Sequence, residues 1–509
     1  MKYLKRLLSI LCCVVLLPLS SFPPLAEAEG SLTAAPGMGS QRLDETTHIT
    51  SDLLVTDPLL LTDGASLVLE SGSLTVAPEG IITGNLEISG ASTHVDIGGT
   101  VNGNIVITSP DADIRISGTV NGQVSVENLD ALTDQQGVIL SLDETARVQS
   151  VFLDGIGNMY FSGTIGEIST STSNQMHASG TRAKVGTFYA RSDAQYNLSD
   201  ASQLDFLVMD CVDVSDGSKG YINNFGVYDL SHVGSAVVNS GWLDFYDGVT
   251  ADHVVLRKGS YLHADCAYYS SPEQDASETP SSAMPPVIHE LYNDGATRVF
   301  NRGKIDYAYF RNSELYNAGS FDTLILESTY LDNEYGARYG SEEEKQNNYW
   351  DIFDNEFTYH ADTLIAISSD INANDGSIFN AVLSERSHLS WNKVRVQTLA
   401  VAGGNTYGWI SDEAEIGAFE AAGESSLNVS RDDVQPPVFS GNPDGTHVRG
   451  GDSTRRAVEL THGLYQAEGK YGDQYFTIPC EAYSVLSVHF EPSGDYSSLL
   501  IQTADGQYA

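Results

Sequence analysis

The sequence of 509 residues lacks the features of a helical, disulfide-stabilised or membrane-spanning protein. Two of its five cysteines, Cys12 and Cys13, lie in the N-terminal apolar segment, and the other three are scattered. Three isolated cysteines form no disulfide framework, so the fold must be stabilised by an apolar core. After residue 28, almost no segment shows helical periodicity, and no apolar run is long enough for a membrane-spanning helix.

Basic residues are also scarce. The chain has 26 Lys and Arg against 68 Asp and Glu, which gives a formal net charge of −42. Nucleic acids and anionic membranes are polyanions, so this charge argues against both as partners. The simplest interpretation is a well-solvated acidic surface, and the charge would also suit cations or a cationic partner.

Motifs of common enzymes are missing as well. There is no G-x-S-x-G, H-E-x-x-H or phosphate-loop pattern. The acidic pair Asp432-Asp433 follows the last clear repeat and is interpreted as a solvated turn. Glycosidases need two carboxylates at a defined separation, which a sequence alone does not provide.

What the sequence does contain begins with a secretory signal. Three basic residues precede an apolar stretch at residues 7–19, and Ala26-Glu27-Ala28 has the pattern of a cleavage site. We therefore expect residues 1–28 to be removed and the protein to be secreted or displayed on the cell surface, without membrane insertion after cleavage. Residues 29–47 are small and polar and are predicted to be a flexible lead-in.

The most regular part of the chain lies between residues 81 and 126. Gly84, Gly103 and Gly122 are 19 residues apart both times, and each is followed by apolar residues in strict alternation. A fixed period of this length with strand-type alternation is typical of a stacked β-solenoid. One rung cannot bury its apolar face alone, but stacked rungs create one continuous core.

After residue 126 the repeat loosens but continues. An apolar residue, then usually Asp or Gly, then any residue, precedes two further apolar positions. The copies begin at Ile165, Val185, Leu204, Phe225, Ile305, Phe321, Val396 and Ile416. Asn-x-Gly turns start at Asn239, Asn293, Asn301 and Asn317. Asn and Gly tolerate left-handed backbone angles, so these asparagines are predicted to stack at corners and to hydrogen-bond to one another.

The prediction is an all-β protein. A single-stranded, right-handed parallel β-helix, or solenoid, is expected over residues 48–430, interrupted by insertions at 267–288 and 331–360. Residues 431–460, which contain Pro436-Pro437 and Gly450-Gly451, are predicted to be a linker. A small, incomplete β-sandwich is expected at residues 461–509.

Two resemblances accompany this prediction. The Gly-Thr-Val-Asn-Gly repeats at Val101 and Val120 resemble the rungs of bactofilins and of autotransporter passenger domains, which implies a parallel β-helix. The C-terminal segment from Gly469 through Tyr475 to Gly506 resembles the bacterial pre-peptidase C-terminal domain, which implies a small β-sandwich. That family continues for one or two strands beyond the Asp-Gly turn, hence the expected incomplete copy.

Candidate binding residues gather in the second insertion, because long loops on a rigid scaffold are common sites of binding. Aromatic faces with acidic rims can stack on sugar rings, although aromatic residues also commonly cover strands. The ligand-binding candidates are Tyr335, Tyr339, Tyr349, Trp350 and His360.

Calcium is the one cofactor that the sequence suggests, at two weak sites. Carboxylate and amide oxygens are the ligands that calcium prefers. The candidate ligands are Glu342, Glu343, Asp351 and Asp354 in the insertion, and Asp370, Asn372 and Asn374 after it. A solvated loop and an Asn-Gly turn are the alternatives. His253, His263 and Cys266 would share one side if two rungs aligned, but they lack metal-site spacing, which favours a structural or surface role.

These observations leave two functions open, and a third possibility is that the chain is the stalk of a longer surface protein. The first is a secreted or cell-surface, non-catalytic β-solenoid, adhesin-like or structural, which presents loops to a polysaccharide or a surface protein. The alternative is a polysaccharide-degrading β-helix enzyme, a lyase or hydrolase, with an active site that carries no recognisable motif.

Overall fold

The computed structural model describes most of the chain between residues 41 and 431. The described residues are 31–32, 41–62, 64–128, 137–211, 225–265, 284–296, 298–317, 319–332, 359–373, 376–384, 387–402, 405–410, 414–422, 426–431, 439–441, 457–459, 475–477, 486–488 and 497–499. No helix occurs among them, and hence none that could cross a membrane.

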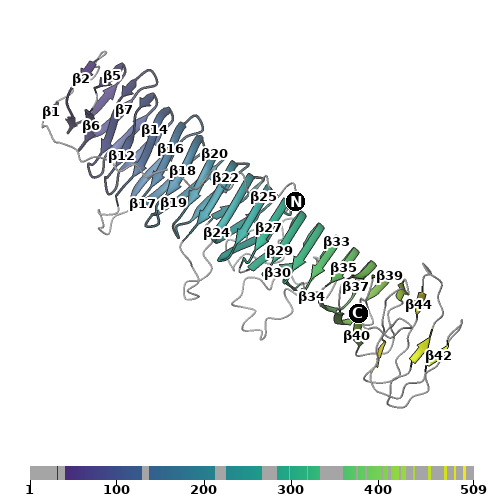
Figure 1. Cartoon of the computed structure of the whole chain (residues 1–509). Coiled ribbons are helices and arrows are strands. Elements are labelled where there is room, and N and C mark those ends of the chain that lie inside the picture. Colours follow the sequence, from purple (N-terminus) through teal and green to yellow (C-terminus); the bar gives the residue numbers. More distant parts are fainter. Residues whose placement is uncertain are drawn as a thin grey trace, which may run out of the picture.

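The described chain forms a parallel β-solenoid, which confirms the predicted fold class (Figure 1). The first turns contain β1 (Ser31–Leu32), β2 (Gln41–Leu43), β3 (Thr47–Ile49), β4 (Leu53–Val55), β5 (Pro58–Leu61), β6 (Ser66–Leu69), β7 (Ser73–Val76), β8 (Ile81–Thr83), β9 (Asn85–Ile88), β10 (His94–Ile97), β11 (Thr100–Asn102), β12 (Ile105–Ile107), β13 (Asp113–Ile116) and β14 (Thr119–Val126).

Longer strands follow in the middle of the rod. They are β15 (Val138–Leu142), β16 (Arg147–Leu153), β17 (Ile156–Phe161), β18 (Thr164–Thr170), β19 (Gln175–Thr181), β20 (Lys184–Ala190), β21 (Tyr196–Ser199), β22 (Gln203–Asp210), β23 (Phe225–Val227), β24 (His232–Tyr246), β25 (Thr250–Arg257), β26 (Ser260–Asp265), β27 (Val287–Asp294), β28 (Arg298–Asn301), β29 (Lys304–Arg311) and β30 (Glu314–Asn317).

The last turns and the C-terminal segments complete the order. They are β31 (Ser320–Glu327), β32 (Tyr330–Asp332), β33 (Tyr359–Ile367), β34 (Asp370–Ala373), β35 (Gly376–Ser384), β36 (His388–Trp391), β37 (Val394–Ala402), β38 (Asn405–Ile410), β39 (Glu415–Ala422), β40 (Ser426–Arg431), β41 (Phe439–Gly441), β42 (Ala457–Glu459), β43 (Tyr475–Thr477), β44 (Leu486–Val488) and β45 (Ser497–Leu499).

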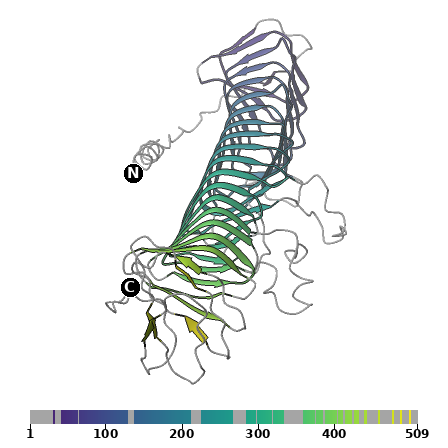
Figure 2. The same ribbon diagram turned by 90° about the vertical axis from the view of Figure 1, so that its right-hand side faces the viewer.

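Two stacks of strands form the faces of the rod (Figure 2). Sheet A contains the long strands from β14 through β22, β25 and β29 to β39, and sheet B contains the strands from β4 through β17, β26 and β30 to β40. Strand β24 crosses from sheet A to sheet B within one turn. Each strand pairs in parallel with its counterparts in neighbouring rungs, because every rung repeats the path of the last.

The 19-residue repeat is in register in the structure. Val101 pairs with Ile82 on one side and with Val120 on the other, and these side chains are fully buried. The stacked glycines mark the corner between two short strands of each rung. A Cβ atom on Gly103 would lie 2.0 Å from the carbonyl oxygen of Gly84, so no side chain fits there.

From β14 onward the two short strands of sheet A merge into one bent strand. In β29, Ile305 and Ala308 are fully buried, whereas Asp306 and Tyr307 between them both face outward. The register between β27 and β29 skips Asp306, as expected for a bulge-like bend. The Asp-or-Gly position of the loosened repeat is therefore the bend of sheet A.

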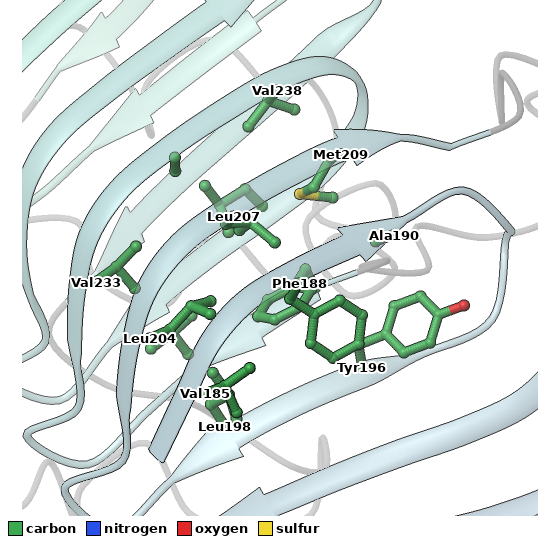
Figure 3. Packing of buried hydrophobic residues seen from close by; sticks show 14 of the residues in the cluster. Val185, Phe188, Ala190, Tyr196, Leu198, Leu204, Leu207, Met209, Val233 and Val238 are labelled. Carbon is green, nitrogen blue, oxygen red and sulfur yellow. The ribbon is translucent and has the colours of Figure 1, made fainter. Parts of the chain in front are cut away.

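One continuous core runs from Ile49 to Ile416. Near the middle of the rod, wide aromatic side chains contribute to it, and Phe188 packs at a tilt against Tyr196 (Figure 3). Phe188 also packs edge-on against Phe225. Short residues such as Ala190 fill the neighbouring positions. Alternation of large and small side chains along the axis keeps the core filled without forcing the rungs apart.

Stacked asparagines occupy a buried corner, as the sequence predicted. The Asn301 Nδ2 donates to the Asn317 Oδ1 at 2.8 Å, and both side chains are nearly inaccessible. The Asn317 side chain also accepts from the Gly319 N–H at 3.2 Å and donates to the Gly319 carbonyl at 3.1 Å. The side-chain amides of Asn301 and Asn317 thus form hydrogen bonds within their own turns and with each other across the two rungs.

Several predicted boundaries differ from the strands. Residues 41–43 and 47, placed in the lead-in, belong to β2 and β3 and pair in parallel with β5 and β6. The insertion at 267–288 overlaps β27, and the insertion at 331–360 overlaps β32 and β33. The predicted linker contains β41 and β42, and β44 and β45 pair antiparallel with β41 and β40. Apolar alternation in such short segments is too brief to be recognised without the neighbouring rung that pairs with it.

The glycine corner yields a first prediction. Gly103→Ala should lower the midpoint of thermal unfolding and destabilise the fold by at least ~1–3 kcal/mol, because its Cβ meets a backbone carbonyl that cannot move alone. Glu87→Ala, on the outward face of β9, is the matched control and should change the midpoint little. Equal midpoints for both variants would show that the corner tolerates a side chain.

The asparagine corner yields a second prediction. Asn317→Ala should destabilise the protein by about 1–3 kcal/mol, because it leaves the buried Asn301 amide and the Gly319 N–H without partners. Asn121→Ala removes a comparable 2.8 Å ladder bond to Asn102 at an exposed corner and should cost less than about 0.5 kcal/mol. Chemical denaturation of the two variants measures the difference, and a larger loss for Asn121→Ala would contradict the interpretation.

Candidate functional site

The structure separates the predicted site residues that it describes. His360 lies on sheet A, exposed, with its Nδ1 2.8 Å from the Ser377 Oγ and its Nε2 3.1 Å from Asp362. Asp370 and Asn372 lie on sheet B, in the paired strand β34 and not in a turn, with Asp370 exposed and Asn372 buried. The remaining candidates lie outside the described residues: Tyr335, Tyr339, Glu342, Glu343, Tyr349, Trp350, Asp351, Asp354 and Asn374.

The suggested histidine and cysteine group does not assemble either. His253 lies on sheet A and His263 on sheet B, while Cys266 is outside the described residues. Within the described part of the chain, no three His, Cys, Asp or Glu side chains are grouped so that they could hold a metal ion. Cys211 is buried, and burial raises its pKa to about 12, so it is a thiol at neutral pH and a poor nucleophile.

A different group comes together on the outward side of sheet B, where β24, β26 and β28 stack. It is called here the His263 cluster and consists of Trp242, Asp244, Tyr246, His263, Asp265 and Arg302. Register brings them together, since Asp244 pairs with His263 and Tyr246 with Asp265. These side chains alternate with core residues, yet His263 is only 4 % exposed. Sheet B is therefore buried on both sides here.

Hydrogen bonds and ion pairs connect the cluster. The Trp242 Nε1 donates to Asp244 at 2.5 Å, and the Tyr246 hydroxyl lies 2.7 Å from the His263 Nδ1. The His263 Nε2 is 3.4 Å from Asp265, which also accepts from the Arg302 guanidinium at 3.2 Å. Aromatic rings surround this chain of contacts: Trp242 stacks on Tyr261, and Phe300 stacks on Tyr316.

The two carboxylates determine the charge of His263. Burial lowers the pKa of His263, but hydrogen bonds and charge from Asp244 and Asp265 outweigh burial and raise that pKa above its usual value. With His263 protonated, two carboxylates face one imidazolium and one guanidinium, so the buried group is electrically neutral. Buried charges are tolerated when they are paired in this way.

Sequence reasoning missed the cluster as a unit. A signal was present, because Trp242-Leu-Asp244-Phe-Tyr246 and Tyr261-Leu-His263-Ala-Asp265 alternate core residues with aromatic or ionisable ones. The register that brings them together could not be read without the structure, and Arg302 follows 37 residues after Asp265.

Outward ionisable groups on sheet A are paired across rungs as well. His253 lies 3.1 Å from Glu290, and His289 lies 2.6 Å from Asp306. Burial would raise the pKa of Asp306, but Lys304 and His289 outweigh it and lower that pKa. Such ladders stabilise the sheet and neutralise part of the acidic charge.

Comparison with protein families, curated proteins and solved structures returned no match for this chain. The bactofilin-like, autotransporter-like and pre-peptidase resemblances therefore stay predictions, and the β-solenoid itself is what the structure establishes.

The raised pKa of His263 yields a third prediction. Protonation of His263 contributes its full stabilisation below the unfolded-state pKa of about 6.5, and the contribution is lost as pH rises through the higher folded-state pKa. His263→Gln should therefore destabilise the protein most at pH 6 and progressively less at higher pH, by about 3–5 kcal/mol at its largest.

The control for this measurement is His94→Gln. His94 lies 3.4 Å from Asp113 in an exposed pair, which should contribute no more than about 1 kcal/mol at any pH. Unfolding midpoints of the three proteins between pH 6 and pH 9 test the prediction. A His263→Gln effect that grows with pH would mean that the cluster holds a neutral imidazole.

Proposed function

We propose that this chain is a secreted or cell-surface, non-catalytic β-solenoid that binds a glycan or a surface protein through its loops and outer faces. The observation that carries the proposal is the pairing of outward acids and bases across rungs, as in His253–Glu290 and His289–Asp306. Paired groups of this kind stabilise a scaffold, whereas general acid–base catalysis requires a group that reaches the substrate. The basic N-terminus, apolar segment and Ala-Glu-Ala site support secretion.

The rod suits such a role physically. A continuous core from Ile49 to Ile416 holds the strands in fixed positions along its length. The sequence inserts long segments between strands, most notably residues 333–358 between β32 and β33. Insertions on a rigid scaffold are common positions for binding residues, and this one contains the aromatic candidates Tyr349 and Trp350.

One observation favours the enzymatic alternative. Asp244 and Asp265 flank His263, and a pair of carboxylates is what polysaccharide cleavage uses. The cluster is however 4–9 % exposed and its groups contact one another, which supports a structural role over contact with a polymer.

A panel of acidic and neutral polysaccharides tests the proposal as a fourth prediction. Binding is followed by affinity electrophoresis, and turnover by reducing ends and by the ultraviolet absorbance of unsaturated products. We expect binding to at least one polymer without turnover, weakened when residues 333–358 are deleted and replaced by two residues, which restores the length of the equivalent corner between Tyr316 and Ser320. The deletion leaves β32 and β33 complete.

Product release would instead support the enzyme. In that case His263→Gln and Asp265→Asn, both checked for folding by circular dichroism, should abolish release if the cluster is the active site. Binding that survives the deletion unchanged would exclude residues 333–358 as the binding segment.

A further inference from the structure

An outward row of apolar residues runs along sheet A. Strand register places one member of the row on each successive rung, and each has intermediate exposure. The row, called here the outer apolar ladder, has one polar member, Ser169, and consists of Phe152, Ser169, Tyr189, Val208, Val237, Val255, Tyr292, Tyr309, Ile325, Ile365, Val382 and Ala400. At ~4.8 Å per rung it extends over roughly 50 Å. Contiguous apolar surface on this scale often marks an interaction site.

Polar side chains flank one side of the ladder. Tyr307, Thr323, Thr363, Asn380 and Thr398 occupy one register position, also one per rung and partly exposed. Hydroxyl and amide groups can both donate and accept hydrogen bonds. From Tyr307 to Thr398 this edge therefore offers uncharged hydrogen-bonding partners at the spacing of the apolar ladder, and before Tyr307 the same column continues with the paired Glu290 and His253.

Side chains of opposite charge flank the other side of the outer apolar ladder. Arg257, Asp294, Arg311 and Glu327 follow one another on consecutive rungs with alternating sign. Arg311 donates twice to Asp294, at 2.9 and 2.6 Å, and Tyr309 on the ladder hydrogen-bonds to Glu327. The Asp294 pKa is lowered chiefly by its hydrogen bond with Arg311. The surface beside the ladder is thus locally neutral.

We propose that the outer apolar ladder binds an unbranched, uncharged polysaccharide that lies along the rod axis. Sugar rings present apolar C–H faces and hydroxyl edges, which match an apolar row between hydrogen-bonding rows. In an extended β-linked chain, the repeat of the sugars is close to the spacing of the rungs. The net charge of −42 disfavours a polyanion, and it disfavours a second copy of this chain as the occupant. The inference rests on the proposed glycan-binding function and assigns its surface and ligand class.

Substitution of the aromatic members of the ladder tests the inference most directly. Tyr292 and Tyr309 are register partners on neighbouring rungs, and Tyr292 packs against Tyr307 with ring centroids 5.7 Å apart. Their removal should weaken binding without opening the core, because the inward neighbours Leu291 and Ala308 are unchanged. The matched control is Tyr160→Ala, an outward tyrosine on sheet B that is 51 % exposed and lies off the ladder.

The experiment uses the full secreted chain with hydroxyethyl cellulose, glucomannan and a series of cello-oligosaccharides of increasing length, with polygalacturonate as the anionic comparison. We expect affinity for a neutral polymer to rise with chain length, and the variant Tyr292→Ala/Tyr309→Ala to bind roughly tenfold or more weakly. Tyr160→Ala should bind like the unchanged protein. Unfolding midpoints confirm that each variant is folded.

Four outcomes would overturn the inference: tight binding by the folded double variant, preference for polygalacturonate, affinity independent of chain length, or a dimer by light scattering that the double variant dissociates. The deletion of residues 333–358, measured in the same assay, separates this inference from the function on which it rests. Binding that depends on the deleted segment and not on the tyrosines would contradict the inference about the outer apolar ladder and leave the proposed function standing. If no polymer binds, both the ladder inference and the proposed glycan-binding function are contradicted.

Discussion

The constraint on which the whole structure depends is the stacking of nearly identical rungs at the spacing of paired strands. Every position along a rung lies directly above and below its counterparts, so each residue must be compatible with its neighbours in register. Apolar positions meet apolar positions, as in the column that joins Ile82, Val101 and Val120. Where the chain passes close to itself, as at Gly103, a side chain would overlap with the carbonyl of the rung below. Polar residues meet partners that can accept their hydrogen bonds, as at Asn301 and Asn317.

The same constraint explains why so much of the fold could be predicted. Stacked rungs favour similar residues at equivalent positions, and the glycines at 84, 103 and 122 display such a repeat directly. The loosened pattern further along also has a physical origin, because the Asp-or-Gly position is the bend at which two adjacent residues face outward. Short strands at the ends were missed for the complementary reason. Segments such as β2 and β41 contain three residues each, and only pairing with a neighbouring rung identifies them as strands.

The candidate site was far harder to predict, because register is a long-range property. His263 was recognised as a residue of interest, but it was grouped with His253, which faces the other sheet. Its contacts in the structure are with Asp244 and Tyr246 from the preceding rung and with Asp265 from its own strand, and Asp265 in turn pairs with Arg302 from beyond a long insertion. The outer apolar ladder was equally hidden, since its members are 16 to 40 residues apart and become a row only when strands are aligned. Alternation identified the inward side chains correctly but did not show which outward ones share a column.

The long insertion before β27 has a consequence for how such a chain can change over time. His253 and Glu290 are 37 residues apart in sequence, whereas His289 and Asp306 are 17 apart, yet both pairs join adjacent rungs, in neighbouring columns at the bend of sheet A. Chain length between two rungs is thus uncoupled from the geometry of the pairing. Segments can be gained, lost or replaced at a corner while every column stays aligned. A protein built this way can change its inserted segments and keep its frame, and two descendants of one ancestor could share a rod while little of their linear sequence still aligns.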